Sequence, residues 1–420
     1  MRETKDSNIK WVGAIPSTWT TELGKHFMTC LDRPVKEDDG VITCFRDGEV
    51  TLRSKRREEG FTVSFQEIGY QGIEPGDLVV HGMDGFAGAI GISDSRGKAT
   101  PVLNVLDTEQ DKRYMMYALR NMAYTDVFLA LSTGIRVRSC DTSWKKLRSL
   151  QYALPPLDEQ SKIADRIEQK SKQVDALIAN QQAQIEKLKQ YKQSLITEVV
   201  TKGLNPDAPM KDSGFIYYGQ IPAQWKLVAT KYLYRIESGA TPKSENPDYF
   251  DGDIPWITPA DYKTDDVFVS GGRRSLTEQG LNSCSTTLIP KGSIIFSKRA
   301  PIGSVAINSE TLCTNQGCLS CIPRTNDLSK YFYYVMSVMA EQYNLLGSGT
   351  TFKEISANNF ANFILPQPPI QEQQLIVSFL DEKCSKIQKL ISIKTQKIDR
   401  MISYKKSLIY EYVTGKKEVV

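Results

Sequence analysis

An internal duplication is the feature that most constrains how this chain folds. The segment Asp6–Trp19 recurs as Asp212–Trp225, and the Asp, Ser, Gly, Ile, Pro and Trp of the two copies coincide at an offset of 206 residues. A second segment, residues 155–201, aligns without a gap with residues 368–414, and 17 of these 47 positions are identical. Because a repeated sequence builds a repeated structure, we expect two copies of one architectural unit.

The stretches between the repeated anchors behave differently. Residues 20–154 and 226–367 differ in length by seven and show no alignment by eye. The chain therefore alternates variable, helical, variable and helical segments. A retained scaffold with two divergent inserts is the pattern expected if each insert recognises something different.

The repeated segments that follow Pro155-Pro156 and Pro368-Pro369 predict long helices. The first copy carries apolar residues at steps of three, four and seven, which mark one narrow stripe on a helix: Ile163, Ile167, Val174, Leu177, Ile178, Ile185, Leu188, Leu195 and Val199. The second copy repeats the stripe from Ile376 to Tyr412, and Gly203 and Gly415 end the two helices. Each helix is about 65 Å long at 1.5 Å per residue, so we expect an antiparallel pair that acts as a rigid spacer. A helix pair inside one large domain is the alternative.

The two variable lobes are predicted to mix strands and helices. Asp77–Val80, Ala89–Ile92 and Val102–Leu106 read as strands in the first lobe, and a helix follows over Arg113–Ala130. In the second lobe the predicted strands are Ile254–Ile257, Ser293–Phe296 and Ser304–Ile307, and the predicted helix covers Leu328–Gln342.

Clusters of basic and hydroxyl residues in predicted loops are candidate DNA contacts. Arg and Lys bind phosphates and guanine edges, and Thr donates hydrogen bonds to phosphates. The candidates are Arg53, Lys55, Arg56, Arg57, Arg136 and Arg138 in the first lobe, and Arg273, Arg274, Lys298, Arg299, Thr350, Thr351 and Lys353 in the second. For any single one of them, a solvated surface charge is the plainer interpretation, and the net charge of +4 does not by itself indicate nucleic acid.

Composition excludes several other classes. No apolar run approaches the roughly 20 residues that span a bilayer, and the first residues lack the apolar stretch of a secretory signal, so we expect no membrane partner and a cytoplasmic protein. Eight scattered cysteines fit reduced thiols. Only two histidines occur, which argues against histidine-based zinc sites and a Ser-His-Asp hydrolase.

Two short patterns imitate catalytic or metal sites. Cys313, Cys318 and Cys321 have a ferredoxin-like spacing, but on a strand Cys318 and Cys321 would face opposite sides, so free thiols in a core are the expectation. Asp248, Asp261 and Lys263 imitate the PD…D-x-K pattern of magnesium-dependent nucleases, a pattern that also arises by chance. No phosphate-binding loop of the G-x-x-x-x-G-K-[ST] type and no adenine-methyltransferase Asn/Asp-Pro-Pro-Tyr/Phe signature occurs.

The whole chain resembles the specificity (S) subunit of Type I restriction–modification systems. The resemblance is carried by Gly-x-Ile-Pro-x-x-Trp at residues 13–19 and 219–225 and by Pro-Pro-x-x-Glu-Gln at residues 155–160 and 368–373. It implies two target-recognition domains that read the halves of an asymmetric, gapped site in double-stranded DNA. It also implies helices that dock two methyltransferase (M) subunits, with restriction (R) subunits joining the larger complex. S-adenosylmethionine, ATP and Mg²⁺ would belong to those partners. Ala99–Leu103 departs from the usual Ser-Pro-aromatic stretch, so contacts there are in doubt.

The predicted fold class is α+β: two mixed α/β target-recognition domains joined by two long antiparallel helices that form a coiled-coil spacer. The predicted boundaries are 1–154 for the first domain, 155–203 for the first helix, 204–366 for the second domain and 367–420 for the second helix. The predicted function is non-catalytic recognition of a bipartite DNA site, with no cofactor, metal or catalytic residue in the chain itself. An autonomous magnesium-dependent nuclease and a coiled-coil scaffold for proteins are the alternatives.

Overall fold

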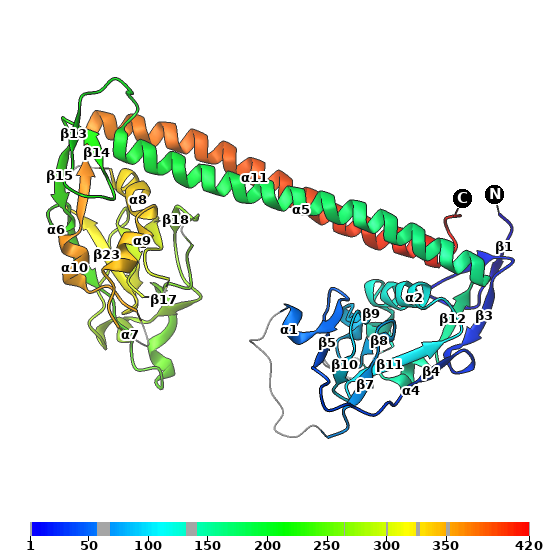
Figure 1. Cartoon of the computed structure of the whole chain (residues 1–420). Helices are drawn as coiled ribbons and strands as arrows, with labels where there is room; N and C mark the ends of the chain where they lie inside the picture. The colour runs from blue at the N-terminus through cyan, green and yellow to red at the C-terminus, as the bar shows by residue number, and fades with distance from the viewer. Residues whose placement is uncertain are drawn as a thin grey trace. The chain divides into compact units, whose positions relative to one another are not determined.

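The computed structural model describes residues 2–56, 68–131, 141–263, 265–299, 301–324, 328–349 and 353–419 (Figure 1). The chain forms two compact units. Unit 1 comprises residues 1–182 and 394–420, and unit 2 comprises residues 183–393, so each unit contains one variable lobe and a part of both long helices. The boundaries predicted at residues 154, 203 and 366 separate lobes from helices, whereas each of these units combines a lobe with helix segments. The predicted boundaries therefore stay a prediction.

The lobe of unit 1 is built around a four-stranded antiparallel sheet. Its strand order is β4 (Met28–Cys30), β11 (Leu103–Thr108), β8 (Leu78–His81) and β9 (Ile90–Ile92). Four two-stranded pairs surround it: β1 (Thr4–Asp6) with β2 (Ala14–Pro16), β3 (Thr20–Leu23) with β12 (Gln151–Leu154), β5 (Ile42–Cys44) with β6 (Val50–Leu52), and β7 (Gln71–Ile73) with β10 (Gly97–Ala99). The three strands predicted for this lobe are confirmed.

The helices of unit 1 are shorter than the sequence pattern predicts. The single helix expected over Arg113–Ala130 is two helices, α2 (Lys112–Tyr124) and α3 (Val127–Ala130). They are separated because Asp126 has a positive φ of 58°, which a continuous α-helix does not permit. Among the described residues of this lobe, the further short helices are η1 (Gly24–His26), α1 (Arg53–Arg56), η2 (Gly85–Ala87) and α4 (Trp144–Leu147).

The lobe of unit 2 holds two larger sheets. A five-stranded sheet has the order β16 (Tyr234–Ser238), β23 (Cys318–Pro323), β20 (Ile294–Ser297), β21 (Val305–Asn308) and β18 (Phe268–Val269). A three-stranded sheet has the order β19 (Arg274–Leu276), β17 (Phe250–Ile257) and β22 (Cys313–Thr314). Two further pairs are β13 (Met210–Asp212) with β14 (Gln220–Pro222) and β15 (Lys226–Ala229) with β24 (Ile364–Gln367). The three strands predicted here are confirmed.

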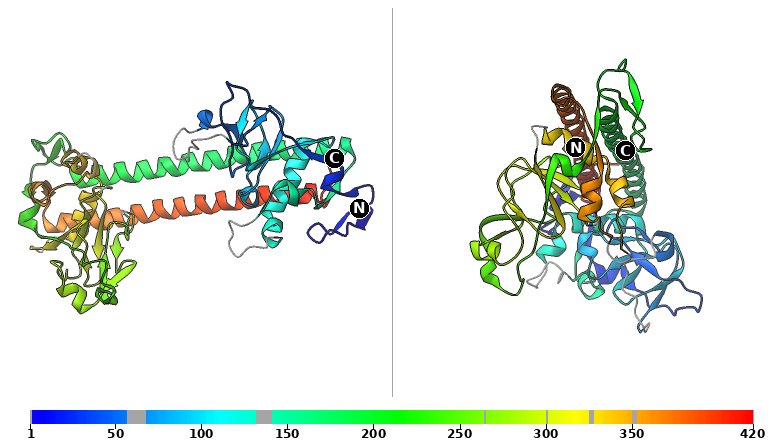
Figure 2. Two further views of the ribbon diagram at one scale, coloured as in Figure 1. Left: turned by 90° about the horizontal axis from the view of Figure 1, so that it is seen from below. Right: turned by 90° about the vertical axis from the view of Figure 1, so that its left-hand side faces the viewer.

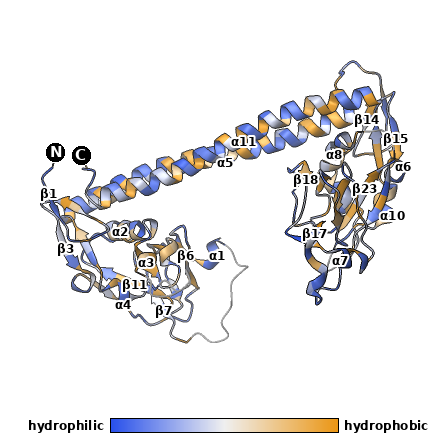
Figure 3. Cartoon of the chain, turned by 180° about the vertical axis from the view of Figure 1, so that it is seen from behind, coloured by the Kyte–Doolittle hydropathy of each residue, from blue (hydrophilic) through white to orange (hydrophobic). Residues whose placement is uncertain are grey.

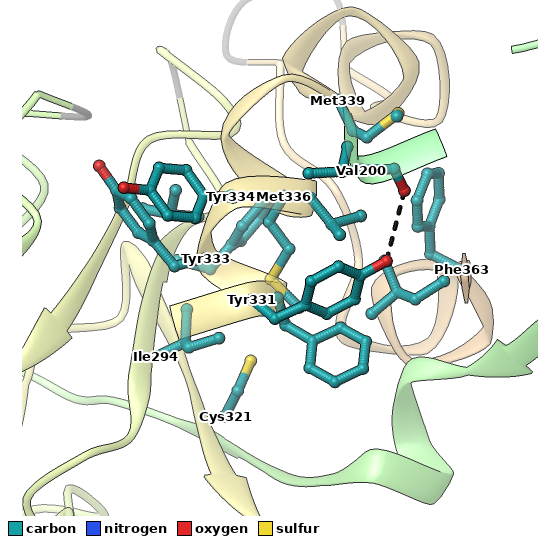
Figure 4. Packing of buried hydrophobic residues seen from close by; sticks show 14 of the residues in the cluster. Val200, Ile294, Cys321, Tyr331, Tyr333, Tyr334, Met336, Met339 and Phe363 are labelled. Atoms are coloured by element: carbon teal, nitrogen blue, oxygen red, sulfur yellow. Dashed lines mark hydrogen bonds between the residues drawn. The ribbon is translucent and has the colours of Figure 1, made fainter. Parts of the chain in front are cut away.

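Aromatic residues fill the core of unit 2. The helix expected over Leu328–Gln342 is α8 (Ser329–Ser337) followed by α9 (Ala340–Leu345), and Tyr331, Phe332 and Val335 of α8 are completely buried. Figure 4 shows Tyr331 packed close to Ile294 and Cys321, with its hydroxyl directed at the carbonyl of Val200. The other helices of this lobe are α6 (Thr230–Leu233), η4 (Pro247–Tyr249), α7 (Glu278–Asn282) and α10 (Ala357–Asn362).

The two predicted long helices are confirmed as α5 (Leu157–Lys202) and α11 (Ile370–Val413). Within unit 1 the first part of α5 packs on the last part of α11, because Ile163 and Ile167 share a core with Leu408 and Tyr412. Within unit 2, in turn, the last part of α5 packs on the first part of α11. The helix segments lie side by side in each unit in both views of Figure 2, and they run antiparallel.

Hydrophilic and hydrophobic residues alternate along both long helices, as the hydropathy colouring of Figure 3 shows. In unit 1 the pairing is supplemented by an ion pair between Lys405 and Asp175, at 2.7 Å. In the part of the chain that the structure describes, no helix has both the length and the hydropathy that crossing a bilayer requires. The α+β fold class with two long antiparallel helices is thus confirmed.

The Gly-x-Ile-Pro-x-x-Trp repeats pack on the helix C-termini. In unit 2, Gly203 ends α5 with a φ of +74°, and a Cβ at this position would lie 3.3 Å from Cζ2 of the buried Trp225. In unit 1, Gly415 follows α11 with a φ of +69°, and its Cβ would lie 3.3 Å from Cη2 of the buried Trp19. Both glycines end their helices as predicted, and the tryptophan of each repeat closes the same junction.

The Pro-Pro-x-x-Glu-Gln repeats tether each lobe to the start of a long helix. Gln160 is fully buried; its Oε1 accepts the N–H of Asp111 at 3.0 Å, and its Nε2 donates to the carbonyl of Pro155 at 2.9 Å. The buried Gln373 makes the matching hydrogen bonds in unit 2: its Oε1 accepts from the N–H of Leu328 at 3.0 Å, and its Nε2 donates to the carbonyl of Pro368 at 3.0 Å. Because Asp111 and Leu328 are the N-caps of α2 and α8, each glutamine positions the first helix of its lobe.

An equivalent tyrosine follows each of these N-caps. The Tyr114 hydroxyl donates to the carbonyl of Ala153 at 2.8 Å and also lies 3.3 Å from the carbonyl oxygen of Val413. The Tyr331 hydroxyl donates to the carbonyl of Val200 at 3.3 Å. Val413 and Val200 lie in the last turns of α11 and α5. The lobes are therefore docked on the helices in the same way, although their sequences do not align by eye.

Candidate nucleic-acid interface

The basic cluster of the first lobe lies on a short helix and not in a loop. The prediction of a loop is wrong for Arg53, Lys55 and Arg56, which belong to α1, directly after β6. Lys55 pairs with Asp94 at 3.2 Å, and Arg56 pairs with Asp47 at 2.6 Å and with Glu49 at 2.9 Å. Arg57, Arg136 and Arg138 lie outside the described residues.

Arg56 is held in a defined orientation by an aromatic ring and two carboxylates. Its guanidinium carbon lies 3.9 Å from the centroid of the Phe45 ring, within the range of a cation–π contact. The hydrogen bonds from Arg56 lower the pKa of the Asp47 carboxyl. Arg56 is thus partly neutralised, and one edge of its guanidinium is already in use.

A pocket of about 580 Å³ lies beside this cluster, within unit 1. Its wall is formed by β5, the turn that follows it, α1 and the end of β8, and three arginines contribute to it: Arg46, Arg53 and Arg56. The Cys44 thiol in the wall is buried, which raises its pKa to about 12 and keeps it uncharged. Two aspartates, Asp47 and Asp84, line the same pocket, so the three arginines leave it with a small excess of positive charge, which suits a polyanion.

Arg46 and His81 also line this pocket and were not among the predicted contacts. Arg46 is 62% exposed and pairs with Asp84 at 2.9 Å. His81, at the end of β8, accepts hydrogen bonds at Nδ1 from the backbone N–H groups of Met83 at 3.2 Å and Asp84 at 3.0 Å. No sequence signal marks His81, because it is brought near Arg46 only by the packing of β5 against β8, two strands of different sheets.

In the second lobe, Arg273 and Arg274 lie at the start of β19. Arg273 is 75% exposed and donates from Nε to Asp261 at 3.0 Å. Arg274 stacks on Phe250 at 3.8 Å, as Arg56 does on Phe45 in the first lobe, and its Nε lies 3.8 Å from Asp251. A stacked arginine edged by a carboxylate is therefore present in both lobes, in segments with no visible sequence similarity.

Lys298 and Arg299 share one carboxylate. Glu354 is bound by Lys298 at 2.9 Å and by Arg299 at 2.7 Å. Burial opposes ionisation of Glu354, but the hydrogen bonds from Arg299 and Lys298 outweigh it, so the pKa of this carboxyl is lowered. The exposed Lys353 precedes Glu354 and adds a third positive charge, whereas Thr350 and Thr351 lie outside the described residues.

The ion pairs of Lys55, Arg56 and Arg299 are exposed enough not to prevent DNA contacts, whereas the Lys298 side chain is only 14% exposed. Exposed pairs contribute about 0–1 kcal/mol to stability, so a phosphate can replace a carboxylate at little cost. The structure thus brings together Lys298, Arg299 and Lys353 at one place in unit 2, and Arg53, Lys55 and Arg56 on one helix in unit 1. Their role as DNA contacts stays a prediction.

The nuclease-like pattern has an ordinary structural explanation. Oδ2 of Asp261 accepts hydrogen bonds from the N–H of Thr258 at 2.9 Å and from its hydroxyl at 2.7 Å, and Oδ1 accepts from Arg273. Asp248 is exposed in η4, where Asn246 caps its N–H. Among the described residues, no group of three or more His, Cys, Asp or Glu side chains has a metal-binding arrangement.

The cysteine pattern also belongs to the core. Cys318 and Cys321 of β23 are buried in different hydrophobic clusters, as expected for residues three apart on a strand. Burial raises the pKa of Cys313 and Cys318 to about 12. The seven described cysteines are free thiols, as predicted.

Comparison with known proteins supports the resemblance inferred from the repeats. Residues 222–400 match the family model of the Type I restriction modification DNA specificity domain. The chain is 37% identical over 165 residues to the Type I restriction enzyme MjaIX specificity subunit of Methanocaldococcus jannaschii, an alignment that covers 39% of this chain and 38% of that protein. It is 27% identical over 199 residues to the EcoR124I/EcoR124II specificity subunit of Escherichia coli, which covers 44% and 48%. The chain thus aligns with less than half the length of these two relatives.

Solved structures with the same fold cover nearly the whole chain. One comes from a study of complex assembly and conformational transition of the type I R-M system; its TM-score is 0.72 at 16% identity, over 96% of this chain and 99% of that one. Another is the HsdS subunit from Thermoanaerobacter tengcongensis, with a TM-score of 0.50 at 15% identity, over 96% and 98%. At these identities the likeness concerns the fold.

Proposed function

From a chain that is related to the specificity subunits of Type I restriction–modification systems and carries their DNA specificity domain at residues 222–400, we propose a DNA-recognition subunit. It binds an asymmetric, bipartite site in double-stranded DNA and directs partner methyltransferase and restriction subunits to it, in the cytoplasm, where the chromosome lies.

One observation carries this proposal. The tethers Gln160 and Gln373 and the junction tryptophans Trp19 and Trp225 dock two lobes on the helices in the same way, yet the lobes differ in sheet topology and in their basic clusters. A duplicated scaffold that carries two different recognition lobes suits a DNA site whose two halves differ in sequence. If the two lobes themselves each bound one copy of the same partner, they would not need to differ.

The chemistry is assigned to partners. The chain lacks the Asn/Asp-Pro-Pro-Tyr/Phe signature of adenine methyltransferases, and Asp261 is occupied by Thr258 and Arg273. We therefore propose that the chain is not catalytic by itself. S-adenosylmethionine, ATP and Mg²⁺ bind the methyltransferase and restriction subunits, and the duplication favours two methyltransferase subunits per chain.

The decisive experiment maps N6-methyladenine in genomic DNA from cells that express this chain with its methyltransferase partner. We expect one asymmetric motif of two half-sites separated by a gap of constant length, absent from cells that express the partner alone. Methylation that does not depend on this chain, or that has no gapped motif, would overturn the proposal.

Assays on the purified chain separate the alternatives. Magnesium-dependent cleavage that is lost in Asp261→Ala would support a nuclease. Absence of any DNA binding that weakens with salt, even with the methyltransferase present, would support a protein scaffold, because phosphate contacts make affinity fall steeply with salt.

A further inference from the structure

His81 lines the pocket of unit 1 and uses one of its two ring nitrogens inside the fold. Nδ1 accepts the N–H groups of Met83 and Asp84, which holds the turn between β8 and η2. Nε2, on the opposite side of the ring, has no hydrogen-bond partner among the described residues, and His81 lines the pocket. The ring is thus oriented by the backbone and leaves a polar atom available.

The backbone bonds also decide which nitrogen carries the proton. Because Nδ1 accepts two N–H groups, the neutral ring carries its hydrogen on Nε2. Burial lowers the pKa of His81; Asp84 opposes this effect and Arg46 adds to it. At neutral pH the imidazole is therefore an uncharged donor with a fixed direction.

The residues around His81 are of the kind that contact both the backbone and the bases of DNA. Arg46 and Arg53 supply positive charge at the same pocket, and Arg46 remains largely exposed although it is paired with Asp84. An arginine can bind a phosphate without regard to sequence or can bind a guanine edge, and a neutral donor with a fixed direction can contact an acceptor on a base edge. The pocket thus combines both kinds of contact.

We infer that His81 is a sequence-reading residue of the lobe in unit 1, donating from Nε2 to an acceptor on a base edge of its half-site, while Arg46 holds the adjacent backbone. This inference rests on the proposed function. The acceptors it fits in the major groove are N7 or O6 of guanine, N7 of adenine and O4 of thymine.

Two substitutions separate the two nitrogens. In His81→Asn, the amide oxygen can occupy the place of Nδ1 and keep the turn, but the Nε2 donor is lost. In His81→Gln, the amide nitrogen can reach the place of Nε2, but the acceptor for Met83 and Asp84 is lost. If His81 has a purely structural role, His81→Asn should recognise the same motif as wild type. If His81 contacts a base, His81→Asn should lose discrimination and His81→Gln should keep it.

The test repeats the N6-methyladenine mapping with these variants and the methyltransferase partner. We expect His81→Asn to lose roughly ten-fold or more of the discrimination at one position of one half-site and to leave the other half-site unchanged. His81→Gln should retain the motif even if its melting temperature falls. The matched control is His26→Asn, the other histidine of the chain, which is exposed beside Glu22 and does not line the pocket.

The outcomes are distinct. An unchanged motif for folded His81→Asn, or equal relaxation in His26→Asn, would overturn the inference. If His81→Asn fails to fold, Arg46→Gln is the second variant, and it should weaken methylation at all sites without changing the motif. If methylation is unaffected in Arg46→Gln, the pocket does not contact DNA and the inference is overturned. A wild-type chain that yields no gapped motif would instead refute the proposed function itself.

Discussion

Trp225 donates its indole N–H to Oε2 of Glu372 over 2.9 Å, and these two residues come from the two different repeated motifs. The matching pair in unit 1 is not bonded. Nε1 of Trp19 is buried and has no hydrogen-bond partner among the described residues, and Glu159 is instead held by Arg2, with Nη2 of Arg2 2.8 Å from Oε2. Arg2 has no basic counterpart in the second copy, where the corresponding residue is Ala208. The duplication therefore produced two junctions of one shape with different polar bonding.

This difference predicts unequal effects of one substitution. Glu372→Ala removes the acceptor of a buried N–H, so we expect the free energy of unfolding to fall by about 1–3 kcal/mol. Glu159→Ala breaks only a partly exposed ion pair, so the expected loss is about 0–1 kcal/mol. Urea unfolding followed by circular dichroism measures both. Equal losses would mean that the indole hydrogen bond contributes nothing of its own.

The glutamine tethers should be needed for stability. Gln373→Ala leaves the N–H of Leu328 and the carbonyl of Pro368 without their side-chain partners in a buried place, and about 1–3 kcal/mol of stability should be lost. Gln160→Ala should behave similarly in unit 1. The control is Gln396→Ala, an exposed position on α11 that should change stability by less than about 0.5 kcal/mol. A tether variant as stable as this control would contradict the assigned role.

The glycine after α11 should not tolerate a side chain. In Gly415→Ala the new Cβ would clash with Cδ of Pro16, and the alanine would also have to adopt a positive φ. Gly214 has a similar φ of +73° but nothing within 4 Å of its Cβ position, so Gly214→Ala isolates the backbone cost of about 1–2 kcal/mol. We expect a clearly larger drop in melting temperature for Gly415→Ala. If the two drops are equal, the contact with Pro16 relaxes without cost.

Acid should weaken the lobe of unit 1 through Asp39. A hydrogen bond from Arg96 lowers the pKa of this carboxyl below its ordinary value of 3.8, and burial opposes the effect. A carboxyl whose pKa is lower in the folded state stabilises the fold above its unfolded pKa. That contribution is lost as the pH falls through the folded pKa.

The comparison of wild type with Asp39→Asn tests this dependence. The difference in unfolding free energy should be constant from pH 5 upward and should shrink below the ordinary value of 3.8. Urea unfolding at intervals of half a pH unit measures it. A difference that is the same at low and neutral pH would show that Asp39 acts without its charge.

Several features of the fold could be predicted because they depend on residues near one another in the chain. The long helices follow from a stripe of apolar residues at helical spacing and from the glycines at positions 203 and 415. Local patterns could not predict that Asp126 interrupts the helix after α2, because its positive φ lies within a stretch of helical periodicity.

The candidate site was predicted less completely. Basic residues identified Arg53, Arg56, Arg273 and Arg274, but not their partners. The stacking of Arg56 on Phe45 and of Arg274 on Phe250 depends on strands that pair across turns and bulges. No spacing in the sequence relates His81 to Arg46, 35 positions earlier.

The sequence by itself determined the duplicated scaffold: two helices, two junction tryptophans and two glutamine tethers, each recognisable because a copy of it exists elsewhere in the chain. Only the tertiary structure decided how each copy is bonded and which polar groups meet in a pocket. The physical reason is that helical periodicity depends on residues three and four positions apart in the chain. The hydrogen bonds of Trp225, Gln373 and His81 instead arise where packing brings a particular donor to a particular acceptor, as Glu372 and Glu159 show by using one repeated position in two ways.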